Sequence, residues 1–288
     1  MLLSDAAELY MQNKTRKLRP NTIEGYASAL RVHVLPAFGS AEMSRVARSD
    51  VQAWIDSFDL PGAALKAYKT LRQVVRWCIR VLGMEVPDPT VGVELPSLPR
   101  RRPRVLDAPG LRAYLRALWG HPCEAAAVCA AALGLRRGEA MGLRWEDVNL
   151  STGEVRIRRS RQVVAGEVVE VPPKTARSER SCWLPRFAVA RLRQLRRGAR
   201  GPLCPMRPDA AARSVRSACR RAGEPWVPWA SLRHTWATLA VEAGVGIETV
   251  ALMLGHSGIS TAYEHYIVPR AAICRDAQRS VERLIMRA

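Results

Sequence analysis

One stretch near the C-terminus, residues 231–269, constrains this chain more than any other. It places an arginine, three histidines and two tyrosines within three short helical patterns. The first pattern is expected to start at Ser231, a good N-cap residue, and to end at Gly244. The second carries an apolar stripe and ends at Gly255, which puts His256 in the loop just beyond it. The region is therefore predicted to be helical, with reactive side chains at its helix ends and loops.

Taken alone, each of these polar residues fits an ordinary helical hairpin. Their spacing favours a functional site. Arg233 is followed by the run Leu254-Gly255-His256-Ser257, and Tyr266 comes ten residues after the histidine. This order resembles the C-terminal signature of the tyrosine recombinases, the phage-integrase family. The resemblance implies an enzyme that breaks and rejoins DNA strands, with Tyr266 as its nucleophile.

The composition agrees with a partner that is a polyanion. The 288 residues carry a formal net charge of +19, from 45 basic and 26 acidic residues, and the sequence pI is about 10.7. A solvated basic surface is the alternative, but such an excess more often indicates nucleic acid binding. No apolar run approaches the roughly 18 residues that a membrane span requires, so a cytoplasmic location is expected. The seven scattered cysteines lack zinc-site spacing and are expected to be reduced thiols.

Residues 1–95 are expected to form a separate helical domain. Four amphipathic patterns follow one another there, with Pro36 expected to end the second. The successive motifs T-I-E-G-Y, H-V-L-P-A-F-G and D-V-Q-A-W-I resemble the core-binding domain of the same recombinases. In that family this domain clasps DNA opposite the catalytic domain.

Residues 96–104 are expected to be a basic, proline-rich linker to a catalytic domain of residues 105–288. Prolines interrupt any periodicity here, which favours an extended chain. Four arginines of the linker are predicted to contact DNA phosphates, although a merely solvated charge run would look the same. They are Arg100, Arg101, Arg102 and Arg104.

The second domain is predicted to mix helices with a small sheet. The alanine-rich stretch 123–133 has no polar face, which indicates a buried helix. Alternating Val155 and Ile157, then Val163-Val164, a turn at Ala165-Gly166 and the run Val168 to Val171 predict a β-hairpin. Residues 181–184 predict a further strand. The fold class is thus mainly α with a small antiparallel β-sheet (α+β). It corresponds to an N-terminal helical core-binding bundle and a mixed catalytic domain of tyrosine-recombinase type.

Two further segments resemble catalytic motifs of the family. The run Gly134-Leu135-Arg136-Arg137-Gly138-Glu139 resembles the first arginine box, which implies that Arg136 is catalytic and that Glu139 supports it. In the family a lysine on a β-turn enters the active site, and Lys174 lies in such a connection. It is also the only lysine after residue 104, where all other basic residues are arginines. Lysine can donate a proton near neutral pH if its pKa is lowered, whereas arginine cannot.

These residues together would supply a complete phosphodiester-cleaving site. Tyr266 would attack phosphorus to form a 3′-phosphotyrosyl link, and Arg136 and Arg233 would hold the non-bridging oxygens. Lys174 would protonate the 5′-leaving oxygen, and His256 would hydrogen-bond the phosphate. No cofactor and no metal ion are expected for this route.

One departure from the family leaves alternatives open. The family usually has a histidine three residues before the second arginine, but that position is Ala230. The chain could therefore be a catalytically weak DNA-binding relative, and a type IB topoisomerase-like DNA-relaxing activity is a further alternative. Tyr263 is a competing nucleophile, although its offset of seven residues from His256 does not match the family.

The main hypothesis is a site-specific DNA recombinase that integrates or excises a mobile element. Its partners would be double-stranded DNA carrying a specific recombination site and further copies of this chain, in a tetramer on two duplexes. An apolar helical stripe beyond Pro269 predicts a C-terminal tail helix. This tail is expected to pack on a neighbouring subunit, with packing on its own catalytic domain as the alternative.

Overall fold

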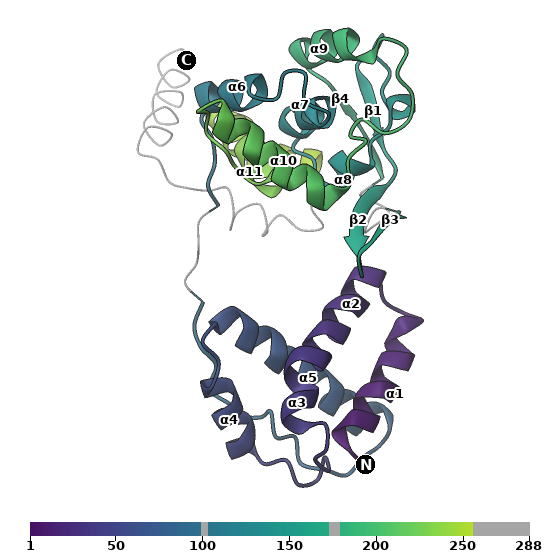
Figure 1. Cartoon of the computed structure of the whole chain (residues 1–288), viewed down its shortest axis with the longest axis vertical. Coiled ribbons are helices and arrows are strands. Elements are labelled where there is room, and N and C mark those ends of the chain that lie inside the picture. Colours follow the sequence, from purple (N-terminus) through teal and green to yellow (C-terminus); the bar gives the residue numbers. More distant parts are fainter. Residues whose placement is uncertain (99–102, 173–178, 256–288) are drawn as a thin grey trace, which may run out of the picture. The chain divides into compact units, whose positions relative to one another are not determined.

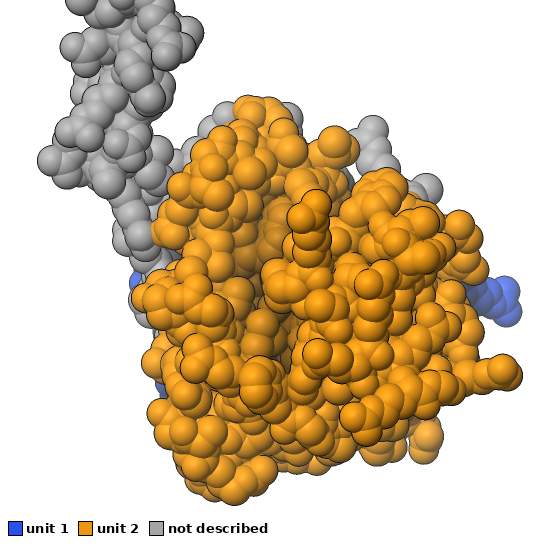
Figure 2. Space-filling view, turned by 90° about the horizontal axis from the view of Figure 1, so that it is seen from above, with its two compact units in different colours: residues 1–101 blue, residues 102–288 orange. Residues whose placement is uncertain are grey.

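The computed structural model describes residues 1–98, 103–172 and 179–255. The chain divides into two compact units, Met1–Arg101 and Arg102–Ala288, which are coloured separately in Figure 2. The division falls inside the segment 96–104 for which the sequence predicts a linker. The assignment of separate DNA-clasping and catalytic roles to the two units stays a prediction.

The first unit is helical throughout its regular structure (Figure 1). Its elements are α1 (Leu3–Thr15), α2 (Pro20–Ala29), the turn η1 (Leu30–Val34), α3 (Leu35–Phe38), α4 (Arg48–Asp56) and α5 (Pro61–Val81). Apolar residues recur at helical spacing along α5 and meet those of α1 and η1 in one core. Tyr10 lies in this core and makes edge-to-face contacts with Tyr26 and Trp77.

The predicted helix stop at Pro36 was wrong, because the backbone stays helical through to Phe38. The turn η1 is π-helical, and the N–H of Leu35 donates to the carbonyl of Leu30, five residues earlier. Proline has no N–H and cannot take part in the regular ladder of an α-helix. A π-helical turn changes the hydrogen-bond register just before the proline, so the backbone can stay helical through it.

The second unit is built around one buried helix, α7 (Glu124–Leu133). Its helices are α6 (Ala108–Arg116), α7 (Glu124–Leu133), α8 (Arg137–Gly142), η2 (Trp145–Asp147), α9 (Arg186–Arg196), α10 (Pro208–Arg221), α11 (Trp229–Glu242) and α12 (Ile247–Leu254). The prediction of a buried alanine-rich helix is confirmed, since nearly every residue of α7 is buried. Helices α6, α8, α9 and α11 all contact α7, and its small side chains allow close approach on every side.

The strands confirm the predicted hairpin and the α+β class. Strands β2 (Ser160–Val164) and β3 (Glu167–Val171) pair antiparallel, with both turn residues at positive φ, 49° for Ala165 and 83° for Gly166. A two-residue turn with positive φ has a backbone twist that matches the right-handed twist of the two strands it joins. Strands β1 (Glu154–Ile157) and β4 (Arg180–Trp183) form a second antiparallel pair. The β part described here is thus two short ladders rather than one sheet.

Two helices complete the unit beside α7. Helices α11 and α12 pack on each other through Ala237, Val250, Ala251 and Leu254. They end at Gly244 and Gly255, both at positive φ, as the sequence predicts. Within the residues that the structure describes, none of the helices is both long and apolar enough to cross a membrane.

Candidate active site

Helix α11 positions Arg233, although it does not begin where the sequence predicts. The helix starts at Trp229, and Ser231 lies in the first turn, its N–H donating to the carbonyl of Pro228 (2.8 Å). Pro228 has the extended backbone of an N-cap, and the earlier start buries Trp229. The predicted cap was wrong because burial of a large side chain outweighs a local serine cap.

Arg233 lies where the C-terminal ends of two helices meet. It is only 7% exposed, and its guanidinium donates to the carbonyl of Gly134 at the end of α7 (3.0 Å) and to that of Leu254 at the end of α12 (2.9 Å). Carbonyls at a helix C-terminus lack partners within the helix and carry partial negative charge. A buried cation at this point therefore stabilises both helix ends and is held rigidly by them.

The C-terminal end of α7 can lie this close to α11 and α12 because the residue that ends it, Gly134, has no side chain. Gly134 has φ of 62°, and a Cβ there would lie 2.6 Å from Cδ2 of Leu254 and 3.0 Å from Cε3 of Trp236. Any larger residue would combine backbone strain with a steric clash. Gly134 thus allows α7, α11 and α12 to converge on Arg233.

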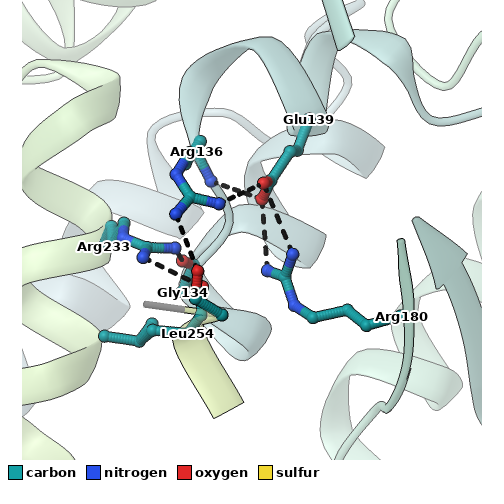
Figure 3. A network of polar contacts seen from close by, with 7 residues as sticks. Gly134, Arg136, Glu139, Arg180, Arg233 and Leu254 are labelled. Atoms are coloured by element: carbon teal, nitrogen blue, oxygen red, sulfur yellow. Dashed lines mark hydrogen bonds and ion pairs between the residues drawn. The ribbon is translucent and has the colours of Figure 1, made fainter. Parts of the chain in front are cut away.

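Arg136 reaches the same place from the start of α8. Its Nη1 donates to Oε1 of Glu139 (2.7 Å), and its Nη2 donates to the carbonyl of Gly255 (2.9 Å). The carbonyls of Leu254 and Gly255 are neighbours in the chain, so the two predicted catalytic arginines meet at the end of α12 (Figure 3). The side chain of Arg136 is 40% exposed, so it is partly accessible to a ligand.

Glu139 connects Arg136 to a third arginine. Its carboxylate accepts hydrogen bonds from the backbone N–H and side chain of Arg136, and from both terminal nitrogens of Arg180 on β4 (3.4 and 3.2 Å). Burial raises the pKa of Glu139, but the charge and hydrogen bonds of Arg180 and those from Arg136 outweigh it and leave the pKa below its usual value. We call Arg136, Glu139, Arg180 and Arg233 the arginine cluster.

Arg180 is the member of this cluster that the sequence analysis missed. The predicted strand began at residue 181, whereas β4 begins at Arg180. In the structure Arg180 and Cys182 are partly buried, while Ser181 and Trp183 are exposed. A charged residue on the inner face of a strand requires a partner in the protein. Its partner, Glu139, lies far away in the sequence, so the pairing itself could not be read from the sequence.

The structure bears on part of the predicted site. It brings together Arg136, Arg233 and Glu139, and it places Arg104 in an exposed position before α6. The other predicted residues lie outside the described residues: Arg100, Arg101, Arg102, Lys174, His256 and Tyr266. Ala230 is exposed in the first turn of α11. No group of three or more metal-ligating side chains occurs among residues 1–98, 103–172 and 179–255.

Comparisons with known proteins give the family. Residues 121–272 match the model of the phage integrase family, and residues 2–58 match a phage integrase N-terminal SAM-like domain. A XerC-like tyrosine recombinase of Caldanaerobacter subterraneus is 28% identical over 187 residues, which are 54% of this chain and 48% of that protein. A putative prophage phiRv2 integrase of Mycobacterium tuberculosis is 26% identical over 88% of this chain and 72% of its own length. The chain thus spans about half of the first relative.

Solved structures share the fold at low sequence identity. The Tn1549 transposon integrase, in complex with a circular intermediate DNA, superposes with a TM-score of 0.79 at 16% identity, covering 98% of this chain and 99% of that one. A lambda integrase tetramer bound to a Holliday junction superposes with a TM-score of 0.70 at 15% identity, covering 93% of this chain and 78% of that one. The family model spans more than half of the chain and includes the whole arginine cluster. This protein is a member of the phage integrase family, the tyrosine recombinases.

Proposed function

We propose that this protein is a site-specific DNA recombinase that cleaves and rejoins DNA through a 3′-phosphotyrosyl intermediate. The observation that carries the proposal is the meeting of Arg136 and Arg233 at the end of α12. Two guanidiniums held at one point can bind both non-bridging oxygens of a phosphodiester and stabilise the charge that develops there. Rigid anchoring matters because the donors then need no rearrangement during the reaction.

The remaining roles are assigned to residues outside the described part of the chain. Tyr266 attacks the phosphorus and releases a 5′-hydroxyl, Lys174 donates the proton to that leaving oxygen, and His256 hydrogen-bonds the phosphate. His256 follows Gly255 directly, and the carbonyl of Gly255 accepts a hydrogen bond from Arg136. The covalent link conserves the energy of the broken bond, so a 5′-hydroxyl of another strand can reverse the step and complete the exchange.

A basic groove on the first unit supports double-stranded DNA as the partner. The groove runs beside α5, and its lining includes six basic residues: Lys14, Lys66, Lys69, Arg72, Arg76 and Arg80. Cations at this density bind phosphates and release counterions, which gives strong salt-dependent affinity. We propose that this surface and the linker arginines, Arg104 among them, hold the DNA.

Integration or excision of a mobile element by a tetramer is the finer proposal. It is supported by relatives named as prophage and transposon integrases and by a lambda integrase that forms a tetramer on a Holliday junction. Type IB topoisomerase-like relaxation is less favoured, because the matched proteins are recombinases and integrases. Exchange of strands between two duplexes separates the two activities, since a topoisomerase would relax supercoils without exchange.

The test begins with mapping of the DNA that the protein binds in cells. A nicked duplex of that site loses a short fragment after cleavage, so the covalent protein–DNA adduct accumulates and is visible on a denaturing gel. The wild type and Tyr263→Phe are expected to form the adduct. Tyr266→Phe keeps the aromatic ring but lacks the attacking oxygen, so it should bind the site equally well and form no adduct. An adduct that persists in Tyr266→Phe and disappears in Tyr263→Phe would refute the assignment.

A further inference from the structure

Glu139 is a buried carboxylate shared by two guanidiniums. It is 3% exposed, and it forms ion pairs with Arg136 (2.7 Å) and Arg180 (3.2 Å). In Figure 3, Arg180 extends from β4 to the side of the carboxylate that Arg136 leaves open. Without Arg180, the full negative charge of Glu139 would act on Arg136 alone, in a region where water screens it poorly.

The balance of charge matters for the proposed reaction. The three guanidiniums and one carboxylate of the arginine cluster leave two net positive charges. A phosphodiester carries one negative charge, and the five-coordinate phosphorus formed by nucleophilic attack carries about two. Removal of Arg180 would leave one net positive charge for a transition state that needs about two.

The structure also holds Arg180 firmly in this position. Arg180 pairs with Ile157 in the register of β1 and β4, and Ile157 is 1% exposed. The side chain of Arg180 is 11% exposed, against 40% for Arg136. Arg180 is therefore suited to neutralise a buried carboxylate, and Arg136 to meet a ligand.

We propose that Arg180 is a positioning residue of the recombinase, which neutralises Glu139 and so keeps the charge of Arg136 available to the scissile phosphate. The proposal rests on the proposed function, because it concerns cleavage at that same site. A positioning role differs in one measurable property from a purely structural role of Arg180. The need for Arg180 should depend on the negative charge of Glu139.

A double-mutant cycle tests this dependence, with the rate of adduct formation on the nicked duplex as the measurement. Arg180→Met is expected to slow cleavage about 10- to 100-fold, by analogy with the partners that orient metal ligands, whose removal has effects of this size. In the Glu139→Gln background the same substitution should change the rate less than about 3-fold, because no carboxylate charge remains to be neutralised. Arg180→Lys keeps the positive charge and should restore most of the rate.

Controls separate this role from a loss of structure. Arg156→Met removes an arginine of the adjacent strand β1, where it pairs with the partly exposed Glu154, and it should cleave like the wild type. Thermal unfolding and binding of a single half-site are measured for every variant. If Arg180→Met does not fold, the rate of Glu139→Gln is compared with that of the double variant. Neither of these two proteins contains a buried carboxylate that lacks its arginine partner, so both are expected to fold.

The outcomes are distinct. An equal loss of rate on removing Arg180 with and without the Glu139 carboxylate would overturn the positioning role, and so would an unaffected Arg180→Met. A wild type that forms no adduct would refute the proposed function, and with it this inference. A rate that depends on Arg180 only when residue 139 is charged would support both.

Discussion

At the scale of single residues, the candidate site depends on charges that compensate one another inside the protein. Arg233 is buried against two helix ends, and Glu139 is buried between Arg136 and Arg180. Removing one member of such a set leaves another charge without compensation, which typically costs about 3–5 kcal/mol when the group is fully buried. Substitutions at these positions are therefore expected to lower stability as well as the proposed activity.

The lowered pKa of Glu139 predicts how stability depends on pH. A carboxyl group whose pKa is lower in the folded than in the unfolded state stabilises the fold above its ordinary pKa of about 4.3. That contribution is lost as the pH falls through the lower folded pKa. Glu139→Gln should therefore be less stable than the wild type at neutral pH and lose less stability on acidification. Urea unfolding between about pH 3 and 7 measures this; parallel pH profiles of the two proteins would contradict it.

At the scale of elements, the site exists because three helices converge at one point. Helices α7 and α12 end at Gly134 and Gly255, and Arg233 of α11 donates to the carbonyls of Gly134 and Leu254. The carbonyl of Gly134 would not meet Arg233 in this way if α7 stopped a residue earlier or later. The helix boundaries are thus part of the site and not only of the fold.

A matched pair of glycines tests this packing. Gly134→Ala should destabilise the protein by about 1–2 kcal/mol for the left-handed backbone and by about 1–3 kcal/mol more for the clash with Leu254 and Trp236. Gly244→Ala meets nothing within 4 Å and should show the backbone cost alone. Thermal unfolding gives both values, and adduct formation should fall only for Gly134→Ala. Equal effects of the two substitutions would show that convergence on Gly134 does not limit stability.

At the scale of the whole molecule, DNA binding and catalysis are proposed to be shared between two units. The first unit carries the basic groove and the second the arginine cluster. Each unit has its own hydrophobic core. A change confined to one unit is therefore expected to leave the fold of the other intact.

The predicted C-terminal tail supplies the test of assembly. If it packs on a neighbouring subunit, a chain truncated after Arg270 should stay folded and bind one half-site with similar affinity, yet fail to bring two duplexes together. The expectation follows because anchors in a partner's pocket stabilise the assembly and not the isolated fold. Thermal unfolding is combined with gel-shift titrations of single and paired sites. A truncated chain that is unfolded, or that still forms the paired complex, would rule this arrangement out.

Several features that depend on neighbouring residues were predictable from the sequence. Gly244 and Gly255 end helices as expected, because glycine adopts positive φ without strain. The hairpin turn at Ala165-Gly166 and the buried alanine-rich helix likewise follow from local pattern. Arg136 and Arg233 were predicted for the site from their resemblance to family motifs, and the structure brings them together.

Features that depend on distant residues were decided only by the tertiary structure. Arg180 and Glu139 are 41 residues apart, and Arg233 lies 99 residues from the carbonyl of Gly134. No periodicity connects such pairs, since they meet only when α7, α8, α11 and β4 pack around one core. The start of α11 at Trp229 has the same cause. The sequence indicated helices such as α7 and α12 and the candidate site residues, whereas packing determined which charges meet, because burial and charge compensation act between segments and not along them.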